Sequence, residues 1–324
     1  MKISVAMCTY NGEKYISEQI NSILSQTVLP DEIIICDDGS TDNTIEIINK
    51  LNNPRIKLQL NPVNLGITRN FEQAIKMCSG DIIFLSDQDD VWMKNKIETI
   101  IEAFSNNPEA YMVFTDGYLT DKNLQPYSTW SMWESSGFNS QEFNLDMLLL
   151  RTIVAGSTMA IKKEALELIL PLSPNVTHDD WIALILTYFN RTSPINKKLI
   201  YYRLNKEEQI DMVECKIKPA FEAKARKNSI IAQFREKLLE SKQKLTGIKN
   251  YTPILQFLNA RLSVLMELPV AEPYLMLNDY IEHLERRSTL PKNKISRWKA
   301  ISKEMPRYLR YENRIAAIVE WLNI

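Results

Sequence analysis

The sequence predicts an α/β protein with a mostly parallel sheet and helices on both faces, followed by an all-helical C-terminal domain. Short apolar runs alternate with segments of helical periodicity through the first half of the chain, and this order is typical of a parallel sheet with crossover helices. In the last third, prolines divide a leucine-rich stretch into several helix-length segments. We place the domain boundary after residue 212, which gives domains of 1–212 and 213–324.

The predicted elements of the first half follow one another in regular order. Runs rich in isoleucine predict strands, and segments with apolar residues three or four positions apart predict helices. The polar segment Ser40-Thr41-Asp42 is suited to cap the second helix. The strands are expected at residues 3–7, 32–36, 55–60, 81–85 and 111–114, and the helices at 13–25, from the cap to 51, at 68–78 and at 91–105.

The segment after the fifth strand is less regular. Residues 116–140 are polar and aromatic, and a stretch of this length between elements is typical of a functional loop or lid. We expect a helix at 143–150, a strand at 157–161, a helix from 179 and a last strand at 198–202. Beyond residue 211, leucines at helical spacing predict a narrow apolar stripe at Leu255, Leu258, Leu262 and Leu265.

Composition narrows the class of protein. The formal net charge is -1, so no global field favours nucleic acid. The four cysteines, Cys8, Cys36, Cys78 and Cys215, show no CxxC spacing, which favours buried free thiols in a reducing compartment. No signal peptide and no apolar run of membrane-spanning length is evident. We therefore expect a cytoplasmic protein, with peripheral contact at the inner face of the cell membrane left open.

The most informative motif is a group of acidic residues directly after the fourth predicted strand. Asp87, Asp89 and Asp90 follow the apolar run 82–85. Open α/β sheets bind their ligands at the carboxyl edge of the strands, where this motif lies. Carboxylates spaced in this way suit a divalent cation that also holds a diphosphate. The motif therefore favours an enzyme that acts on a nucleotide-linked substrate.

Three more polar loops follow predicted elements at what we expect to be the same edge. They are Thr9-Tyr10-Asn11-Gly12, Asp37-Asp38-Gly39-Ser40 and His178-Asp179-Asp180. The loops after successive parallel strands converge, so these side chains are predicted to line one cleft. One carboxylate group would hold a leaving diphosphate, and a distant one would take a proton from an incoming hydroxyl.

These motifs together resemble those of family 2 glycosyltransferases of the GT-A fold, a Rossmann-like α/β architecture. The resemblance covers about residues 1–205 and leaves out the C-terminal third. Its Asp-Gln-Asp-Asp-Val-Trp motif, with His-Asp downstream, is most similar to that of rhamnosyltransferases that build bacterial surface polysaccharides. The matching segments are Thr9-Tyr10-Asn11-Gly12-Glu13, Asp37-Asp38-Gly39-Ser40-Thr41-Asp42, Asn64-Leu65-Gly66, Arg69-Asn70-Phe71, Ser86-Asp87-Gln88-Asp89-Asp90-Val91-Trp92, Val154-Ala155-Gly156-Ser157-Thr158-Met159 and His178-Asp179.

The resemblance implies a role for each residue at the nucleotide end of the donor. Thr9, Tyr10 and Asn11 would border the nucleobase. Asp38 would accept the imide proton of the base, and Arg69 would sit by the base or the phosphates.

The resemblance also assigns the metal and the reacting groups. Asp87 would bind the ribose, and Asp89 would coordinate a Mg²⁺ or Mn²⁺ that bridges the diphosphate. Asp179 would be the general base of an inverting transfer. Relatives place a histidine ligand where Asn205 stands here, and an amide oxygen is a weaker, neutral ligand, which leaves open weak metal binding, binding that needs the donor phosphates, and loss of the metal. Arg203 could supply positive charge near the diphosphate.

The implied reaction moves a hexose or deoxyhexose to a hydroxyl of a bacterial surface glycan, free or lipid-linked. By resemblance, dTDP-rhamnose is the favoured donor, with a UDP-hexose close behind. One alternative is a sugar-phosphate nucleotidyltransferase, but the segment after Met7 lacks the glycine-rich basic loop such enzymes carry. The other alternative is a non-catalytic nucleotide-sugar-binding scaffold, which Asn205 motivates and the carboxylates oppose.

Several residues also have a purely structural interpretation. Asp90 is expected to cap the helix predicted from Val91, and Asp180 could cap the later helix or touch the acceptor. His178 is as well suited to a loop hydrogen bond as to an acceptor contact. Trp130 and Trp133 could pack in the core or stack on a sugar ring, whereas Trp181 is expected in the core.

The segment 286–310 is strongly basic, and Glu304 is its only acidic residue. A solvated helical face is slightly favoured over a surface for anionic lipid or a lipid-diphosphate acceptor. Nucleic acid is a poor third, because no recognised binding motif accompanies the basic residues. The C-terminal helices as a whole could pack on the first domain, pair two subunits into a homodimer, or approach the membrane.

Overall fold

A computed structural model describes residues 1–136, 138–145, 148, 153–174, 176–204, 286, 290 and 293–311. The chain divides into two compact units, Met1–Ile210 and Asp211–Ile324. Each unit is described by itself. In the second unit the described helix is α13, Lys294–Tyr311, so most of the predicted C-terminal helices, including the leucine stripe at 255–265, lie outside the described residues.

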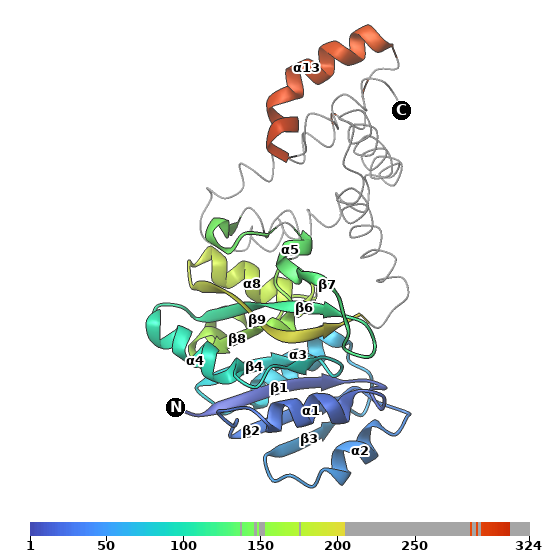
Figure 1. The fold of residues 1–324 in the computed structure, drawn as a ribbon, viewed down its shortest axis with the longest axis vertical. Helices are drawn as coiled ribbons and strands as arrows, with labels where there is room; N and C mark the ends of the chain where they lie inside the picture. Colours follow the sequence, from blue (N-terminus) through green and yellow to red (C-terminus); the bar gives the residue numbers. More distant parts are fainter. Residues whose placement is uncertain are drawn as a thin grey trace. The chain divides into compact units, whose positions relative to one another are not determined.

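The first unit is built on one nine-stranded sheet (Figure 1). The strand order is β3-β2-β1-β4-β8-β6-β9-β5, and β7 pairs with β6. The strands are β1 Ile3–Thr9, β2 Glu32–Asp37, β3 Ile56–Leu60, β4 Ile82–Ser86, β5 Val91–Trp92, β6 Met112–Thr120, β7 Pro126–Ser131, β8 Met159–Lys162 and β9 Thr192–Arg203.

The four neighbouring strands β3, β2, β1 and β4 run parallel to one another. Every residue of β1, β2 and β4 is buried. A strand buried along its whole length must be covered on both faces, which explains why these segments read as nearly continuous apolar runs. All three strands end in polar residues at the same edge of the sheet.

Helices cover both faces of this sheet. On one face, α1 Ile16–Leu24, α2 Thr44–Lys50 and α4 Lys96–Asn106 share a single apolar core with β1, β2 and β4. On the opposite face, α3 Ile67–Met77 packs against β1 and β2, and α8 His178–Tyr188 packs against α3 (Figure 1). Cys36, which alternates with the core residue Ile35 along β2, contacts Gln73 and Met77 of α3.

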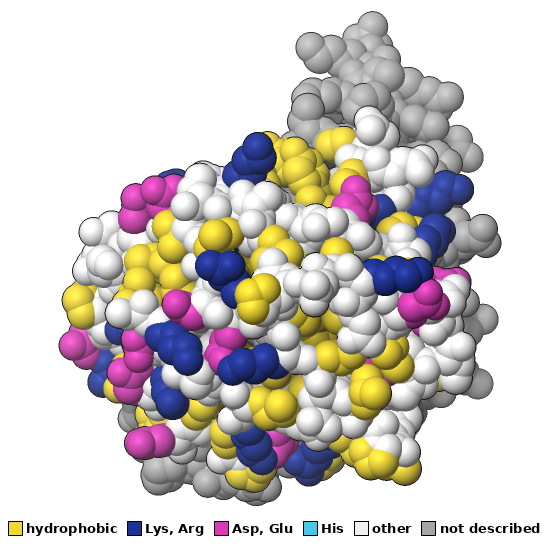
Figure 2. Space-filling view, turned by 90° about the horizontal axis from the view of Figure 1, so that it is seen from below, with side chains coloured by type: hydrophobic (Ala, Val, Ile, Leu, Met, Phe, Trp, Pro, Cys, Tyr) yellow, Lys and Arg dark blue, Asp and Glu magenta, His cyan; other side chains and the backbone are white. Residues whose placement is uncertain are grey.

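The remaining described elements are short. They are α5 Met132–Ser136, η1 Ser140–Glu142, η2 Gly156–Thr158, η3 Lys163–Ala165 and α7 Leu166–Ile169. On the face drawn in Figure 2, the coloured basic and acidic side chains lie interspersed among apolar ones, as expected for a net charge of -1. None of the helices in the described residues is long and apolar enough to cross a membrane.

The prediction of a mostly parallel sheet is wrong in its second half. β8 is antiparallel to both β4 and β6, and β5 is antiparallel to β9. The predicted loop 116–140 instead contains the end of β6, the hairpin strand β7 and helix α5. Antiparallel partners can be joined by short turns, which the sequence at 121–125 provides. The result is a mixed α/β sheet.

The helix predicted from Val91 begins later than expected. Val91 and Trp92 form strand β5, which pairs with Tyr201 and Ile200 of β9, and α4 begins only at Lys96. Asp90 therefore does not cap a helix. The pairing joins segments more than a hundred residues apart in the chain, so no local pattern could have indicated it.

Glu32 ties the amino end of the sheet together. The buried carboxylate accepts hydrogen bonds from Ser4, Ser79 and Lys57 at 2.7 Å each. Burial would raise the pKa of Glu32, but these hydrogen bonds outweigh it and lower the pKa from 4.5 to about 2. A carboxylate with a depressed pKa stabilises the fold above its unfolded pKa, and this contribution is lost as the pH falls toward 2.

Glu32→Gln is therefore expected to lower the free energy of unfolding by about 2 kcal/mol at pH 7, and by less at pH 3. Urea denaturation followed by circular dichroism at both pH values measures the difference. Glu46→Gln is the control, because Glu46 pairs with Lys50 on the exposed side of α2. An equal loss of stability at pH 3 and pH 7 would contradict the linkage to Glu32.

Candidate active site

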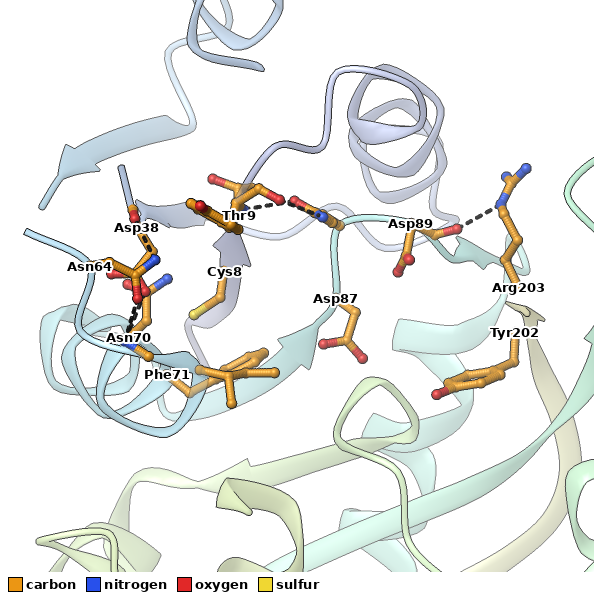
Figure 3. A pocket seen from close by; sticks show the side chains of 14 residues that line it. Cys8, Thr9, Asp38, Asn64, Asn70, Phe71, Asp87, Asp89, Tyr202 and Arg203 are labelled. Carbon is orange, nitrogen blue, oxygen red and sulfur yellow. Dashed lines mark hydrogen bonds between the residues drawn. The ribbon is translucent and has the colours of Figure 1, made fainter. Parts of the chain in front are cut away.

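A cleft of about 640 Å³ opens at the carboxyl edge of β1, β2 and β4. Asp38 and Asn64 lie at one end of it, Asp89 and Arg203 lie at the other, and Asp87 lies between them (Figure 3). Of the four loops predicted to line one cleft, those after β1, β2 and β4 do so, whereas residues 178–180 are not part of the lining. The full lining is Cys8, Thr9, Tyr10, Asp38, Asn64, Gly66, Ile67, Asn70, Phe71, Asp87, Gln88, Asp89, Tyr202 and Arg203.

Two adjacent aspartates after β2 have different tasks. Asp37 holds the turn, because its carboxylate accepts hydrogen bonds from the backbone of Ser40 at 2.8 Å and from the hydroxyl of Thr9 at 2.8 Å. Asp38 lines the cleft instead, and its Oδ1 accepts from the backbone N–H of Leu65 at 2.8 Å. Its Oδ2 accepts from the N–H of Gly66 at 2.9 Å. A carboxylate oxygen has two lone pairs, so Oδ2 can still accept from a ligand.

Gly66 is needed at the start of α3. Its φ is +78°, a left-handed conformation that glycine adopts without steric cost. This conformation directs its N–H to Asp38. The β3–α3 loop is thereby fastened to the end of the cleft where Asp38 lies.

The loop after β1 forms one wall of the cleft through Thr9 and Tyr10, and the Tyr10 side chain is half exposed. Asn11 has a φ of +50° and does not line the cleft. Its backbone N–H and its side chain bind Ser40 and Thr41 of the neighbouring loop. The structure therefore brings two of the three residues predicted beside the nucleobase into the cleft.

Arg69 is a second predicted donor residue that the cleft lining does not include. Its guanidinium pairs with Glu72 at 2.6 Å along the side of α3. Asn205, the predicted metal ligand of neutral amide type, lies outside the described residues. Asp87, Asp89 and Arg203 do lie in the cleft, as predicted from the sequence.

The carboxylates of the β4–β5 segment repel one another. Burial raises the pKa of Asp87 well above its usual value, and the charges of Asp90, Asp89 and Asp179 raise it further. Burial and the charge of Asp89 raise the pKa of Asp90 to about 7. Asp90 Oδ2 is buried and has no hydrogen-bond partner among the described residues. Three carboxyl groups of one short segment therefore lie within electrostatic reach of one another, and the charged form of each disfavours that of its neighbours.

Lys96 is the buried cation beside this group. It is fully buried at the start of α4, and its Nζ donates to the carbonyl oxygen of Ser157. The ammonium also lies 4.0 Å from the centre of the Trp92 ring. Burial lowers the pKa of Lys96 to about 7, although Asp90 and Asp87 act in the opposite direction. Lys96 links the carboxylate group to the segment at 156–158.

Arg203, at the end of β9, holds the other end of the cleft together. Its backbone N–H donates to Asp90 at 3.0 Å, and its Nε donates to the carbonyl oxygen of Asp89 at 2.8 Å. Its two terminal nitrogens donate to the carbonyl oxygen of Lys122 and to Glu18. The guanidinium also lies 4.1 Å from the centre of a tyrosine ring, that of Tyr15. Each nitrogen of this side chain is thus engaged by a protein acceptor, and Nε fixes the backbone of Asp89.

Asp179 lies in the first turn of α8 and approaches the cleft from the α8 side. Its Oδ2 accepts a hydrogen bond from the N–H of Gly156 at 3.2 Å. It is absent from the cleft lining, but its charge raises the pKa of Asp87 and of Tyr202, which both line the cleft. Asp179 is therefore within electrostatic reach of the donor-side carboxylates.

His178 packs tightly behind Asp179. Its ring stacks on Phe71 with centroids 3.8 Å apart, and neither ring nitrogen has a hydrogen-bond partner among the described residues. Burial lowers the pKa of His178, while Asp179 opposes that shift. A Cβ at Gly156 would come within 2.6 Å of His178 Nε2. Glycine at 156 therefore allows His178 and Asp179 to sit close to this backbone, and the loop hydrogen bond considered for His178 is not present in the part described.

The tryptophans named in the sequence analysis have different surroundings. Trp133 is buried and packs against Phe114 and Phe138, so it is a core residue. The side chain of Trp130 lies outside the described residues. Trp181 donates its ring N–H to the carbonyl oxygen of Ile169 and is half-buried.

Some cleft residues had no predicted role. Asn70, Phe71 and Tyr202 line the cleft although their positions in the sequence predicted no function for them.

Lys96 could have been recognised from the sequence as a buried lysine, because it lies four positions before Ile100 on the apolar stripe of α4. A lysine on a buried stripe needs a charged partner.

A divalent cation fits the donor set at one end of the cleft. Among the described residues, no three histidine, cysteine, aspartate or glutamate side chains form a complete metal site. Mg²⁺ commonly binds through one or two carboxylates together with substrate phosphates. Asp87 and Asp89 line the cleft, and Asp89 is the carboxylate at this end that would hold such a shared ion.

Solved structures with a similar fold include that of S. aureus TarS residues 1–349 in complex with UDP. It has a TM-score of 0.52 and 20% sequence identity, and the match covers 99% of this chain and 90% of that chain. At this identity the likeness shows the fold alone. The GT-A-type α/β fold predicted for the first part of the chain is confirmed.

Relatives with similar sequences are bacterial glycosyltransferases. An uncharacterized glycosyltransferase of Nostoc is 30% identical over 220 residues, which are 63% of this chain and 65% of that protein. The dTDP-rhamnosyl transferase RfbG of Shigella flexneri is 42% identical over 113 residues, which are 32% of this chain and 39% of RfbG. The chain thus spans less than two thirds of these relatives.

The family model for glycosyl transferase family 2 matches residues 4–170. This range contains β1 to β4, the loops that line the cleft from Thr9 to Asp89, and Gly156 beside Asp179. With more than half of its residues in this match, the chain belongs to glycosyl transferase family 2.

Proposed function

We propose that the protein is an inverting glycosyltransferase that uses a nucleoside-diphosphate sugar and a hydroxyl acceptor. The observation that carries the proposal is the cleft into which β2 brings Asp38 and β4 brings Asp87 and Asp89. Asp179 reaches the same group of carboxylates from α8. A binding scaffold would not need this last carboxylate.

The proposed reaction separates charge along the cleft. The donor lies with its base near Asp38 and Tyr10 and its diphosphate near Asp89. As the bond to the diphosphate breaks, the sugar develops oxocarbenium character. Asp179 takes the proton from the acceptor hydroxyl, whose oxygen bonds to the anomeric carbon from the face opposite the leaving diphosphate and so inverts that centre.

Asp89 is the residue that would hold a Mg²⁺ or Mn²⁺ ion together with the donor phosphates. Such an ion would neutralise the charge that builds on the leaving diphosphate. Asp87 lines the cleft beside Asp89, and the Nε of Arg203 fixes the backbone of Asp89. Arg203 serves the diphosphate indirectly in this arrangement, because its own donors are engaged by protein groups.

For the donor we propose dTDP-rhamnose first and a UDP-hexose second, on the likeness to the dTDP-rhamnosyl transferase RfbG over 113 residues. A surface glycan, free or attached to a lipid diphosphate, is the proposed acceptor. On α13, Trp298, Lys299 and Lys303 are exposed, whereas Arg297 is buried. Contact of this helix with an anionic membrane stays a prediction.

The proposal is tested by thermal shift with UDP, dTDP and their sugar conjugates, each with and without Mn²⁺. A nucleotide at a hundred times its Kd stabilises the native state by about 2.7 kcal/mol. We expect a rise in melting temperature with a nucleotide that becomes larger with Mn²⁺. Asp89→Asn should lose the part that depends on Mn²⁺.

The matched control is Glu102→Gln, which neutralises an exposed carboxylate of α4 outside the cleft. It should behave like the parent protein. If no nucleotide or nucleotide sugar raises the melting temperature of the parent with or without the metal, the proposed function is wrong.

A further inference from the structure

Gln88 connects two walls of the cleft. It stands between Asp87 and Asp89 in the sequence, lines the cleft, and its side chain reaches the loop after β1. Its Oε1 accepts a hydrogen bond from the backbone N–H of Tyr10 at 2.9 Å, and its Nε2 donates to the Tyr10 carbonyl oxygen at 3.1 Å. One side-chain amide therefore satisfies both backbone polar groups of Tyr10.

The rest of the Tyr10 loop is fastened to a different neighbour. The N–H of Asn11 donates to Ser40 Oγ at 2.8 Å, and the N–H of Gly12 donates to Thr44 Oγ1 at 2.7 Å. These bonds join the loop to the segment between β2 and α2, at the end of the cleft where Asp38 lies. Gln88 joins the same loop to the carboxylates at the opposite end.

Gly12 leaves room for this contact. A Cβ at position 12 would lie 2.3 Å from Gln88 Oε1 and 2.7 Å from Gln88 Cδ. The three nearest atoms to that Cβ all belong to Gln88, and no left-handed φ is present at Gly12. An added methyl group would thus collide with the Gln88 amide while the backbone itself could accept alanine.

We propose that Gln88 is a positioning residue that couples the Tyr10 wall to the Asp87 and Asp89 carboxylates before a nucleoside diphosphate binds. This inference rests on the proposed function, because it assigns Gln88 a task in donor binding. A wall that is already ordered loses less conformational freedom when the ligand arrives. The amide thereby sets the distance between the base end and the diphosphate end of the cleft.

The first arm of the test needs no ligand. The Tyr10 amide is expected to exchange its hydrogen faster in Gln88→Ala than in the parent protein, because its acceptor is removed. Hydrogen exchange read at residue 10 measures this effect. Gln59→Ala is the matched control, since Gln59 is a glutamine of β3 whose amide donates to the carbonyl oxygen of Leu60 outside the cleft. Its Tyr10 exchange should equal that of the parent.

The second arm measures the Kd of UDP and of dTDP with Mn²⁺ by calorimetry. Loss of two exposed hydrogen bonds is expected to weaken nucleotide binding by about tenfold in Gln88→Ala, with the melting temperature of the free protein unchanged. Gly12→Ala should weaken binding to a similar extent, because it displaces the same amide. The double variant should be no weaker than either single variant.

Each outcome separates the two proposals. If Gly12→Ala weakens binding as much in the Gln88→Ala background as in the parent, its effect does not pass through Gln88 and the inference is wrong. Unchanged nucleotide affinity in Gln88→Ala, with normal binding by the parent, overturns the inference and leaves the proposed function standing. Failure of the parent to bind either nucleotide overturns both, while the exchange at Tyr10 still reports whether the Gln88 contact exists.

Discussion

Asp179→Asn is expected to lower the kcat of glycosyl transfer by about 10²–10⁴, because a general base contributes a factor of this size. Asparagine has the shape of aspartate and can still accept the hydrogen bond that Gly156 donates to Oδ2. It cannot take the proton of the acceptor hydroxyl. Binding of the nucleotide should change little, since Asp179 does not line the cleft.

The measurement combines transfer rates with a Kd for the donor nucleotide. Asp180→Asn is the matched variant, because Asp180 is the next residue of the same helical turn. It is expected to keep most of the transfer rate. A loss confined to Asp180→Asn would move the role of base to that residue, and full activity in both variants would remove this turn of α8 from the chemistry. An inverted anomeric configuration in the product, read by NMR, is expected in the parent.

The central part of the fold was predictable because it is encoded locally. β1, β2 and β4 are buried on both faces, so they appear in the sequence as short apolar runs followed by polar turns. The elements missed were those fixed by partners far along the chain. Val91–Trp92 becomes a strand only because β9 lies beside it, and Met159–Lys162 runs antiparallel only because it enters between β4 and β6.

The site follows the same division. Asp38, Asp87 and Asp89 were predictable, because parallel strands deliver the residues at their ends to one edge of the sheet. The contacts that hold them were not. Nothing in the sequence pairs Gln88 with Tyr10. Such hydrogen bonds depend on side-chain directions that only the packed structure fixes.

Arg203 could act as a positive charge near the diphosphate or as a set of hydrogen-bond donors that holds protein groups, and the two roles predict different results. If Arg203 acted on the diphosphate as a positive charge, Arg203→Lys would keep most of the activity. Its guanidinium is instead shared among Glu18 and the carbonyl oxygens of Asp89 and Lys122. A lysine has one charged nitrogen and cannot reproduce this fork. We therefore expect Arg203→Lys to lose activity nearly as severely as Arg203→Met.

The same contacts predict the size of the effect on the fold. Without the guanidinium, two carbonyl oxygens lose their donor, and each such loss costs about 1–3 kcal/mol when the group stays buried. The pair with Glu18 adds little, because Glu18 is half exposed. We expect both variants to lower the free energy of unfolding by about 2–4 kcal/mol.

The transfer rate should fall by more than the loss of stability explains, because the backbone that Arg203 no longer holds is that of Asp89. At a temperature where both variants remain folded, the Mn²⁺ concentration needed for half-maximal transfer is expected to rise in each of them. Lys198→Met is the control, since Lys198 pairs with Glu134 away from the cleft. If this Mn²⁺ concentration stays at the parent's value in Arg203→Lys and rises only in Arg203→Met, the charge of Arg203 matters and its fork of donors does not. An equal rise of this Mn²⁺ concentration in both variants would mean that Arg203 acts by holding the backbone of Asp89 in place.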